Sequence, residues 1–210
     1  MKSKYQGLAP HEIEVKSFEI IESELKEELD PQTAFITKRC IHTSADFEYA
    51  ESLYFSAGVV EQALEALQSN ATIITDTTMA LSGINKHALN ELGLKAECFI
   101  RDEEVARLAK ERGTTRSREA VDKAIQIPEP LIFVVGNAPT ALIRIYELIQ
   151  ENKVNPALVI GVPVGFVNVV ESKEMMMQCA VPQIINRGRK GGSNIAAAIV
   201  NALMYKLTRK

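Results

Sequence analysis

The sequence predicts an α/β fold: a three-layer, doubly wound and mostly parallel sheet of five strands, preceded by an N-terminal helical extension. Two patterns carry this prediction. From residue 71 onward, short β-branched or apolar runs alternate with longer helical segments, as in parallel sheets with helical crossovers. One run, Leu131–Val135, is apolar at every position, which is typical of a strand covered on both faces. The 210 residues suit a single domain, 1–210, long enough to bury a full core.

The N-terminal extension is expected to consist of helices. His11–Leu29 is charged and amphipathic, with Ser17 on its polar side. Residues 32–44 follow an Asp-Pro helix-start signal, so we expect a second helix there. Val59–Gln68 also has a helical pattern, whereas the aromatic segment Phe47–Ala57 is irregular and receives no assignment.

The alternating part continues to the end of the chain. Its predicted strands are Ala71–Thr75, Ala96–Ile100, Leu131–Val135, Ala157–Ile160 and Gln183–Ile185. Its predicted helices are Met79–Leu92, Glu103–Ile127 with a break at Gly113, Ala138–Glu151, Val167–Cys179 and Ser193–Leu207. Because crossovers between parallel strands are almost always right-handed, this order predicts an open sheet with helices on both faces.

Composition excludes several classes of protein. A net charge of -3 argues against a general nucleic-acid binder. Cys40, Cys98 and Cys179 are scattered and lack metal-ligand spacing, which indicates free thiols in a reducing compartment and no metal site. Met1–Val15 has no apolar signal region, and no apolar run approaches the roughly 20 residues of a membrane span. We therefore expect a cytoplasmic protein that does not enter a membrane.

The stretch Thr37–Asp46 holds the strongest candidate for catalytic chemistry. Arg39 and His42 are three residues apart, so a helix places them on one face. This sets a fixed cation beside the one side chain whose unperturbed pKa lies near neutrality. At this point a solvated helix face with an uninvolved histidine is an equally good interpretation.

Polar and glycine-rich segments follow the predicted strands, where open α/β sheets bind their ligands. The residues there that we predict to contact a ligand are Asp76, Asn137, Gly161, Gly165, Arg189, Gly191 and Gly192. Arg116 and the basic residues of 187–190 add positive charge, and helix N-termini at Ala138, Val167 and Ser193 favour anions. Together these features predict a pocket for a ligand with several carboxylates or phosphates. The alternative for each single glycine is a helix cap or turn without a ligand.

Known nucleotide signatures are absent from these segments. Gly161–Phe166 is not a G-x-G-x-x-G loop, and Arg187–Ser193 is not a Walker loop. The chain also has no Trp, and no pair of aromatic residues is placed to sandwich a flavin. A nucleotide-binding enzyme stays a weaker alternative, which micromolar binding of flavin mononucleotide would revive.

Taken together, the motifs resemble those of the precorrin-8X methylmutase family of corrin-ring biosynthesis. The matching segments are Lys16–Phe18, Arg39–His42, Thr115–Ser117, Val135–Leu142, Gly161–Val167, Glu171–Lys173 and Gly188–Ser193. They span most of the chain and occur in order, which makes the resemblance specific. Cys40 departs from the bulkier apolar residue expected there, a difference that bears on packing more than on chemistry.

The resemblance implies a flavodoxin-like sheet, a homodimer, and an isomerase that needs no cofactor. Its reaction would move a methyl group between neighbouring carbons of a tetrapyrrole in cobalamin biosynthesis. The substrate would be precorrin-8X or cobalt-precorrin-8, and the product hydrogenobyrinate or cobyrinate. Any cobalt would arrive within the substrate. His42 corresponds to the family's catalytic histidine, and Ser17 and Arg39 to substrate-contacting positions.

In this interpretation His42 donates a proton to a ring nitrogen, a contribution typically worth about 10²–10⁴-fold in rate. Arg39 beside it would make the imidazolium a stronger acid. The His-Thr-Ser-Ala-Asp form of the motif resembles the cobalt-containing branch. The main alternative is a non-catalytic carrier of corrinoids, with the same cations and glycines but no titrating group. Met175–Met177 and Phe47–Phe55 are the candidate contact surfaces of the dimer.

Overall fold

The computed structural model describes residues 9–209, so part of the Met1–Val15 segment lies outside the described residues. A six-stranded sheet has the order β1-β6-β5-β4-β2-β3. All neighbouring strands are parallel except β1, which pairs with β6 in the antiparallel direction. The strands are β1 Leu53–Phe55, β2 Thr72–Thr75, β3 Lys95–Glu97, β4 Leu131–Val135, β5 Leu158–Gly161 and β6 Gln183–Asn186.

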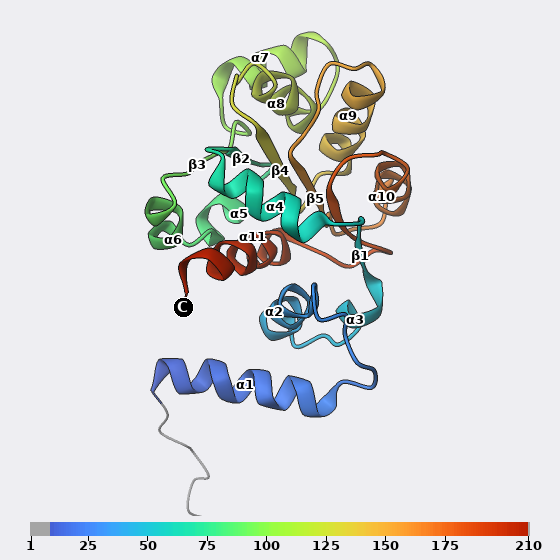
Figure 1. The fold of residues 1–210 in the computed structure, drawn as a ribbon. Coiled ribbons are helices and arrows are strands. Elements are labelled where there is room, and N and C mark those ends of the chain that lie inside the picture. Colours follow the sequence, from blue (N-terminus) through green and yellow to red (C-terminus); the bar gives the residue numbers. More distant parts are fainter. Residues whose placement is uncertain (1–8, 210) are drawn as a thin grey trace, which may run out of the picture.

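Helices cover both faces of this sheet, as the sequence predicted (Figure 1). The N-terminal helices are α1 Pro10–Glu24, α2 Ala34–Ser44, α3 Tyr49–Ser52 and α4 Val59–Gln68. Those after β2 are α5 Thr78–Gly83, α6 Lys86–Glu91, α7 Glu103–Glu111 and α8 Arg116–Ala124. The remaining helices are α9 Pro139–Gln150, α10 Val169–Met177 and α11 Ser193–Thr208.

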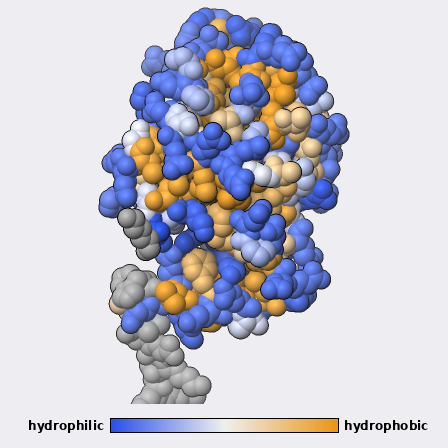
Figure 2. All heavy atoms as spheres, in the orientation of Figure 1, coloured by the Kyte–Doolittle hydropathy of each residue, from blue (hydrophilic) through white to orange (hydrophobic). Residues whose placement is uncertain are grey.

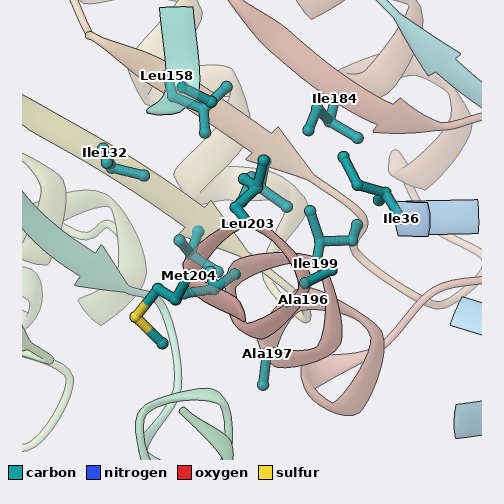
Figure 3. Close-up of a cluster of buried hydrophobic side chains, with 14 of the residues drawn as sticks. Ile36, Ile132, Leu158, Ile184, Ala196, Ala197, Ile199, Leu203 and Met204 are labelled. Carbon is teal, nitrogen blue, oxygen red and sulfur yellow. The ribbon is translucent and has the colours of Figure 1, made fainter. Parts of the chain in front are cut away.

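The two faces of the sheet form two separate cores, because side chains alternate along each strand. In β4, Ile132 and Val134 belong to one core, and Leu131, Phe133 and Val135 to the other. Figure 3 shows the first core, in which Ile36 of α2 and a row of α11 side chains meet the strands. Helix α11 packs on α2, so the N-terminal extension is attached to the sheet through the last helix of the chain.

Several predicted elements differ from the observed ones. The sheet has a sixth strand, β1, within the segment that the sequence left unassigned. The first helix ends at Glu24 rather than Leu29. The segment Glu103–Ile127 forms two helices, because Gly113 has a φ of +62° and the Thr115 hydroxyl then caps α8. The segment Met79–Leu92 also forms two helices, α5 and α6, because the side chain of Asn85 accepts a hydrogen bond from the Ala88 amide and caps the start of α6.

The face shown in Figure 2 combines polar side chains with several apolar areas. Large exposed hydrophobic side chains occur on α1, at the start of α5 and on the loop after β5. They are Ile13, Val15, Ile20, Met79, Val164, Phe166 and Val167. None of the helices in residues 9–209 combines the length and hydropathy that crossing a bilayer requires.

Candidate active site

His42 lies in the last turn of α2, half-buried beneath α1. Its ring centroid is 5.4 Å from that of Phe18, and the ring planes are tilted by 44°. Helix α2 stops at Ala45, which adopts a left-handed φ of 55° and donates its amide to Ile41. The imidazole is therefore held at a helix terminus against an aromatic ring, while retaining access to solvent.

Arg39 lies on the same face of α2, as its spacing from His42 predicted. Its guanidinium is 2.6 Å from the Glu14 carboxylate and 4.9 Å from the centroid of the Phe18 ring. Arg209 also contacts Glu14, at 2.9 Å. Burial raises the pKa of Glu14, but the hydrogen bond and charge of Arg39, with those of Arg209, outweigh it and lower the pKa. A ligand carboxylate at Arg39 would therefore have to share it with Glu14 or displace Glu14.

Ser17 belongs to the same region, because it precedes Phe18 on α1. It is half-buried, and its hydroxyl donates a 2.7 Å hydrogen bond to the carbonyl of Ile13. The three N-terminal site residues predicted from the sequence thus lie on two packed helices, α1 and α2. Their roles toward a substrate stay predictions.

Asp76 occupies the point where the strand order reverses, between β2 and β4. Its carboxylate accepts hydrogen bonds of 2.7–2.9 Å from the backbone amides of Gly136, Asn137 and Ala138. Burial raises the pKa of Asp76, and these three hydrogen bonds oppose the shift. The N-terminus of α9, predicted to be open to an anionic ligand, is thus already bonded to a carboxylate of the protein. The side chain of Asn137 is exposed beside it.

The loops after β5 and β6 pack against each other through their backbones. The amide of Gly192 donates to Val162 at 2.9 Å, and that of Gly165 donates to Arg189 at 3.1 Å. Gly191 has a φ of +153°, and a Cβ there would lie 2.1 Å from the Val162 oxygen. Glycine is required at this position by contact between the two loops, before any ligand is considered. The buried Gly161 likewise leaves room for Ile185.

The basic residues of the β6 loop connect this edge of the sheet to the helix that carries His42. Lys190 is 2.5 Å from Asp46 and 2.8 Å from Glu48, both just beyond the end of α2. The hydrogen bond to Asp46, together with that to Glu48, raises the pKa of Lys190. The guanidinium of Arg189 lies 5.5 Å from the centroid of the Phe166 ring. The loop and the carboxyl end of α2 thus form one continuous surface.

Arg116 is exposed in the first turn of α8. The preceding Thr115 caps that helix and donates a 2.9 Å hydrogen bond to the hydroxyl of Thr140 in the first turn of α9. This contact holds the start of α8 close to the end of β4. Arg116 therefore adds a solvent-facing cation to the carboxyl edge of the sheet.

The site contains apolar residues that the sequence reasoning did not identify. Met79, Phe166 and Val167 are 69%, 80% and 78% exposed, on segments that follow β2 and β5. Val164, at 46%, lies on the same loop as Phe166. Val164 and Phe166 flank Gly165 at the exit of β5, and large apolar side chains there were a usable signal, because such loops are normally polar. We refer to these four residues as the apolar platform.

A cavity of about 720 Å³ lies between the α1–α2 connection and β1, away from the predicted site residues. Its wall is acidic. The carboxylates that line it are Glu24, Glu27, Glu28, Asp30, Glu48 and Glu51. Such a wall repels a ligand with several carboxylates, so this cavity is not a suitable site for one. A cavity of about 440 Å³ between α1, α2 and α11 is lined by Arg39 and other cations.

The fold and the edge described above define a class of protein: a doubly wound α/β protein with a cationic, glycine-lined surface that Lys190 joins to the end of the helix carrying His42. Comparison with known proteins specifies this class further. Residues 12–206 match the precorrin-8X methylmutase family. The chain therefore belongs to that family, whose members are isomerases.

Relatives from several organisms match over most of their length. The cobalt-precorrin-8 methylmutase of Salmonella typhimurium is 49% identical, over 94% of this chain and 96% of the relative. The precorrin-8X methylmutase of Pseudomonas aeruginosa is 39% identical, over 79% of this chain and 80% of the relative. The crystal structure of precorrin-8X methylmutase from Thermus thermophilus aligns with a TM-score of 0.85 at 39% identity, over 92% and 94% of the two chains.

Proposed function

We propose that this isomerase acts on cobalt-precorrin-8 and moves one methyl group between neighbouring ring carbons to give cobyrinate, in cobalamin biosynthesis. The observation that carries the proposal is the exposed ring of Phe166 against Arg189, on a loop that Lys190 joins to the His42 end of α2, with Arg116 exposed at the same carboxyl edge of the sheet. A corrin-type macrocycle has an apolar ring and a rim of carboxylates, and this surface offers a counterpart to each. The relative at 49% identity that acts on the cobalt form supports the choice of substrate.

The proposed reaction requires two things of the protein: a group that donates and accepts a proton, and a surface that holds the ring in a fixed orientation. The bond from the methyl group to one carbon breaks as its bond to the neighbouring carbon forms, so the composition does not change. His42 donates a proton to a ring nitrogen during the shift and accepts a proton when conjugation is restored. The backbone contacts between the β5 and β6 loops keep the surface rigid, which favours a fixed orientation of the ring. In this proposal no cofactor takes part, and cobalt is carried by the substrate.

We also propose that the chain acts as a homodimer in which each partner helps to cover the other's site. The platform is open to solvent in one copy, since Phe166 and Val167 are largely exposed. Within Met175–Met177, Met176 is fully buried, so only the half-buried Met175 and Met177 offer surface there. The outer face of α1 is the better candidate, because Ile13 and Ile20 are about half exposed there.

Assaying the purified protein with cobalt-precorrin-8 and precorrin-8X side by side tests the proposed substrate. We expect faster turnover of the cobalt form at equal concentration, followed by the change in absorbance of the macrocycle. Equal rates would remove the preference for cobalt. Binding of both compounds with turnover of neither would favour a corrinoid carrier.

A further inference from the structure

Lys173 of α10 is a fully buried cation beneath the β6 loop. Its ammonium donates 2.8 Å hydrogen bonds to the carbonyls of Gly188 and Lys190. Burial lowers the pKa of Lys173 to about 8, so most of the side chain stays charged at neutral pH. A buried lysine is rare, and this one is bonded to two carbonyls of a single short loop.

Asn186 provides a second support from the same side. It is fully buried, and its amide donates to the carbonyls of Arg187 at 3.2 Å and Lys190 at 2.8 Å. Its own oxygen accepts a 2.7 Å hydrogen bond from the hydroxyl of Ser52. Two buried side chains therefore direct the carbonyls of residues 187, 188 and 190 into the protein.

This arrangement determines where the loop amides point. In a planar trans peptide the carbonyl of one residue and the amide N–H of the next point in opposite directions. The amides of Arg189 and Gly191 therefore face away from Lys173, on the side of the loop where residues 187–190 are exposed. Within residues 9–209, neither amide donates to a backbone carbonyl.

We propose that Lys173 is a positioning residue that holds the loop so that the amides of Arg189 and Gly191 bind a carboxylate of the substrate. This inference rests on the proposed function and deepens it. The exposed Arg189 side chain adds charge to the same carboxylate. Lys173 never touches the substrate, so its loss changes affinity through the loop.

The test compares Lys173→Met with Lys153→Met, a control that removes an exposed lysine paired with Glu151. Two probes are used: cobyrinate, with free carboxylates, and its permethyl ester, without them. We expect Lys173→Met to weaken cobyrinate binding and raise KM about tenfold, the effect of losing one such interaction. We expect kcat to stay within about twofold of wild type, and ester binding to be the same in all three proteins.

Several outcomes would overturn the inference. Unchanged cobyrinate affinity in folded Lys173→Met would show that the lysine only fills space, and equal losses for acid and ester would indicate general damage. If Lys173→Met does not fold, hydrogen exchange on the wild type decides. Cobyrinate, but not the ester, should slow exchange at Arg189 and Gly191, and no slowing would refute the carboxylate contact. A wild type that turns over neither substrate would instead count against the proposed function.

Discussion

Glu14 joins α1 to the rest of the chain through two arginines. Arg39 comes from α2, and Arg209 follows α11. Both guanidinium groups also lie over the ring of Tyr205, at 5.3 and 3.5 Å. Arg39 of this cluster also lies over the ring of Phe18, and this ring contacts His42.

Replacing Glu14 with Gln should lower the free energy of unfolding by about 1 kcal/mol at pH 7, since the cluster is partly exposed. The pKa of Glu14 is lower in the folded protein, so its contribution is present above the unfolded pKa and lost as pH falls through the folded one. Urea denaturation at neutral and acidic pH checks this. The wild type and the variant should converge in acid, and a constant difference would contradict the ion-pair explanation.

The sequence predicted local relations between site residues better than distant ones. The shared face of Arg39 and His42 follows from a three-residue spacing on one helix. The bonding of Asp76 to the amide of Gly136 joins residues 60 positions apart, and only the folded sheet brings them together. Lys173 was part of a recognised motif, but nothing in its neighbours indicated burial beneath the β6 loop.

At the scale of elements, the contact between the loops that follow β5 and β6 requires glycine at position 191. Gly191→Ala places a Cβ against the Val162 oxygen and should destabilise the protein by about 2–4 kcal/mol. Gly188→Ala is the matched control: its φ is +70°, but no atom lies within 4 Å of the added Cβ. It should cost only about 1–2 kcal/mol. Urea midpoints measure both, and equal losses would show that the close contact is unimportant.

Most elements could be predicted because hydrophobic patterns are local. Strand β4 and helix α4 occur at the predicted residues. Strand β1 was missed because it is only three residues long and half-buried, so it shows no alternation. Its conformation is set by pairing with β6, a contact that the local sequence does not encode.

At the scale of the whole molecule, the outer face of α1 is not covered by other elements within residues 9–209 of a single copy (Figure 1). Ile13 and Ile20 are seven residues apart and so share one face of the helix. We expect a dimer in sedimentation equilibrium, and we expect Ile20→Glu to weaken it. Glu19→Gln, which changes a neighbouring exposed position, should leave it intact. A fully active wild-type monomer at assay concentration would rule out the shared site.

The most direct test of the account compares turnover with binding in His42→Ala, using the substrate that the wild type prefers. Because His42 is half-buried at a helix terminus, its loss should preserve the fold and the affinity. Turnover should fall by about 10²–10⁴-fold, the usual contribution of a positioned general acid. His87→Ala, at an exposed position on α6, is the control and should behave as the wild type. Normal turnover by His42→Ala with normal binding would show that the histidine takes no part in the reaction.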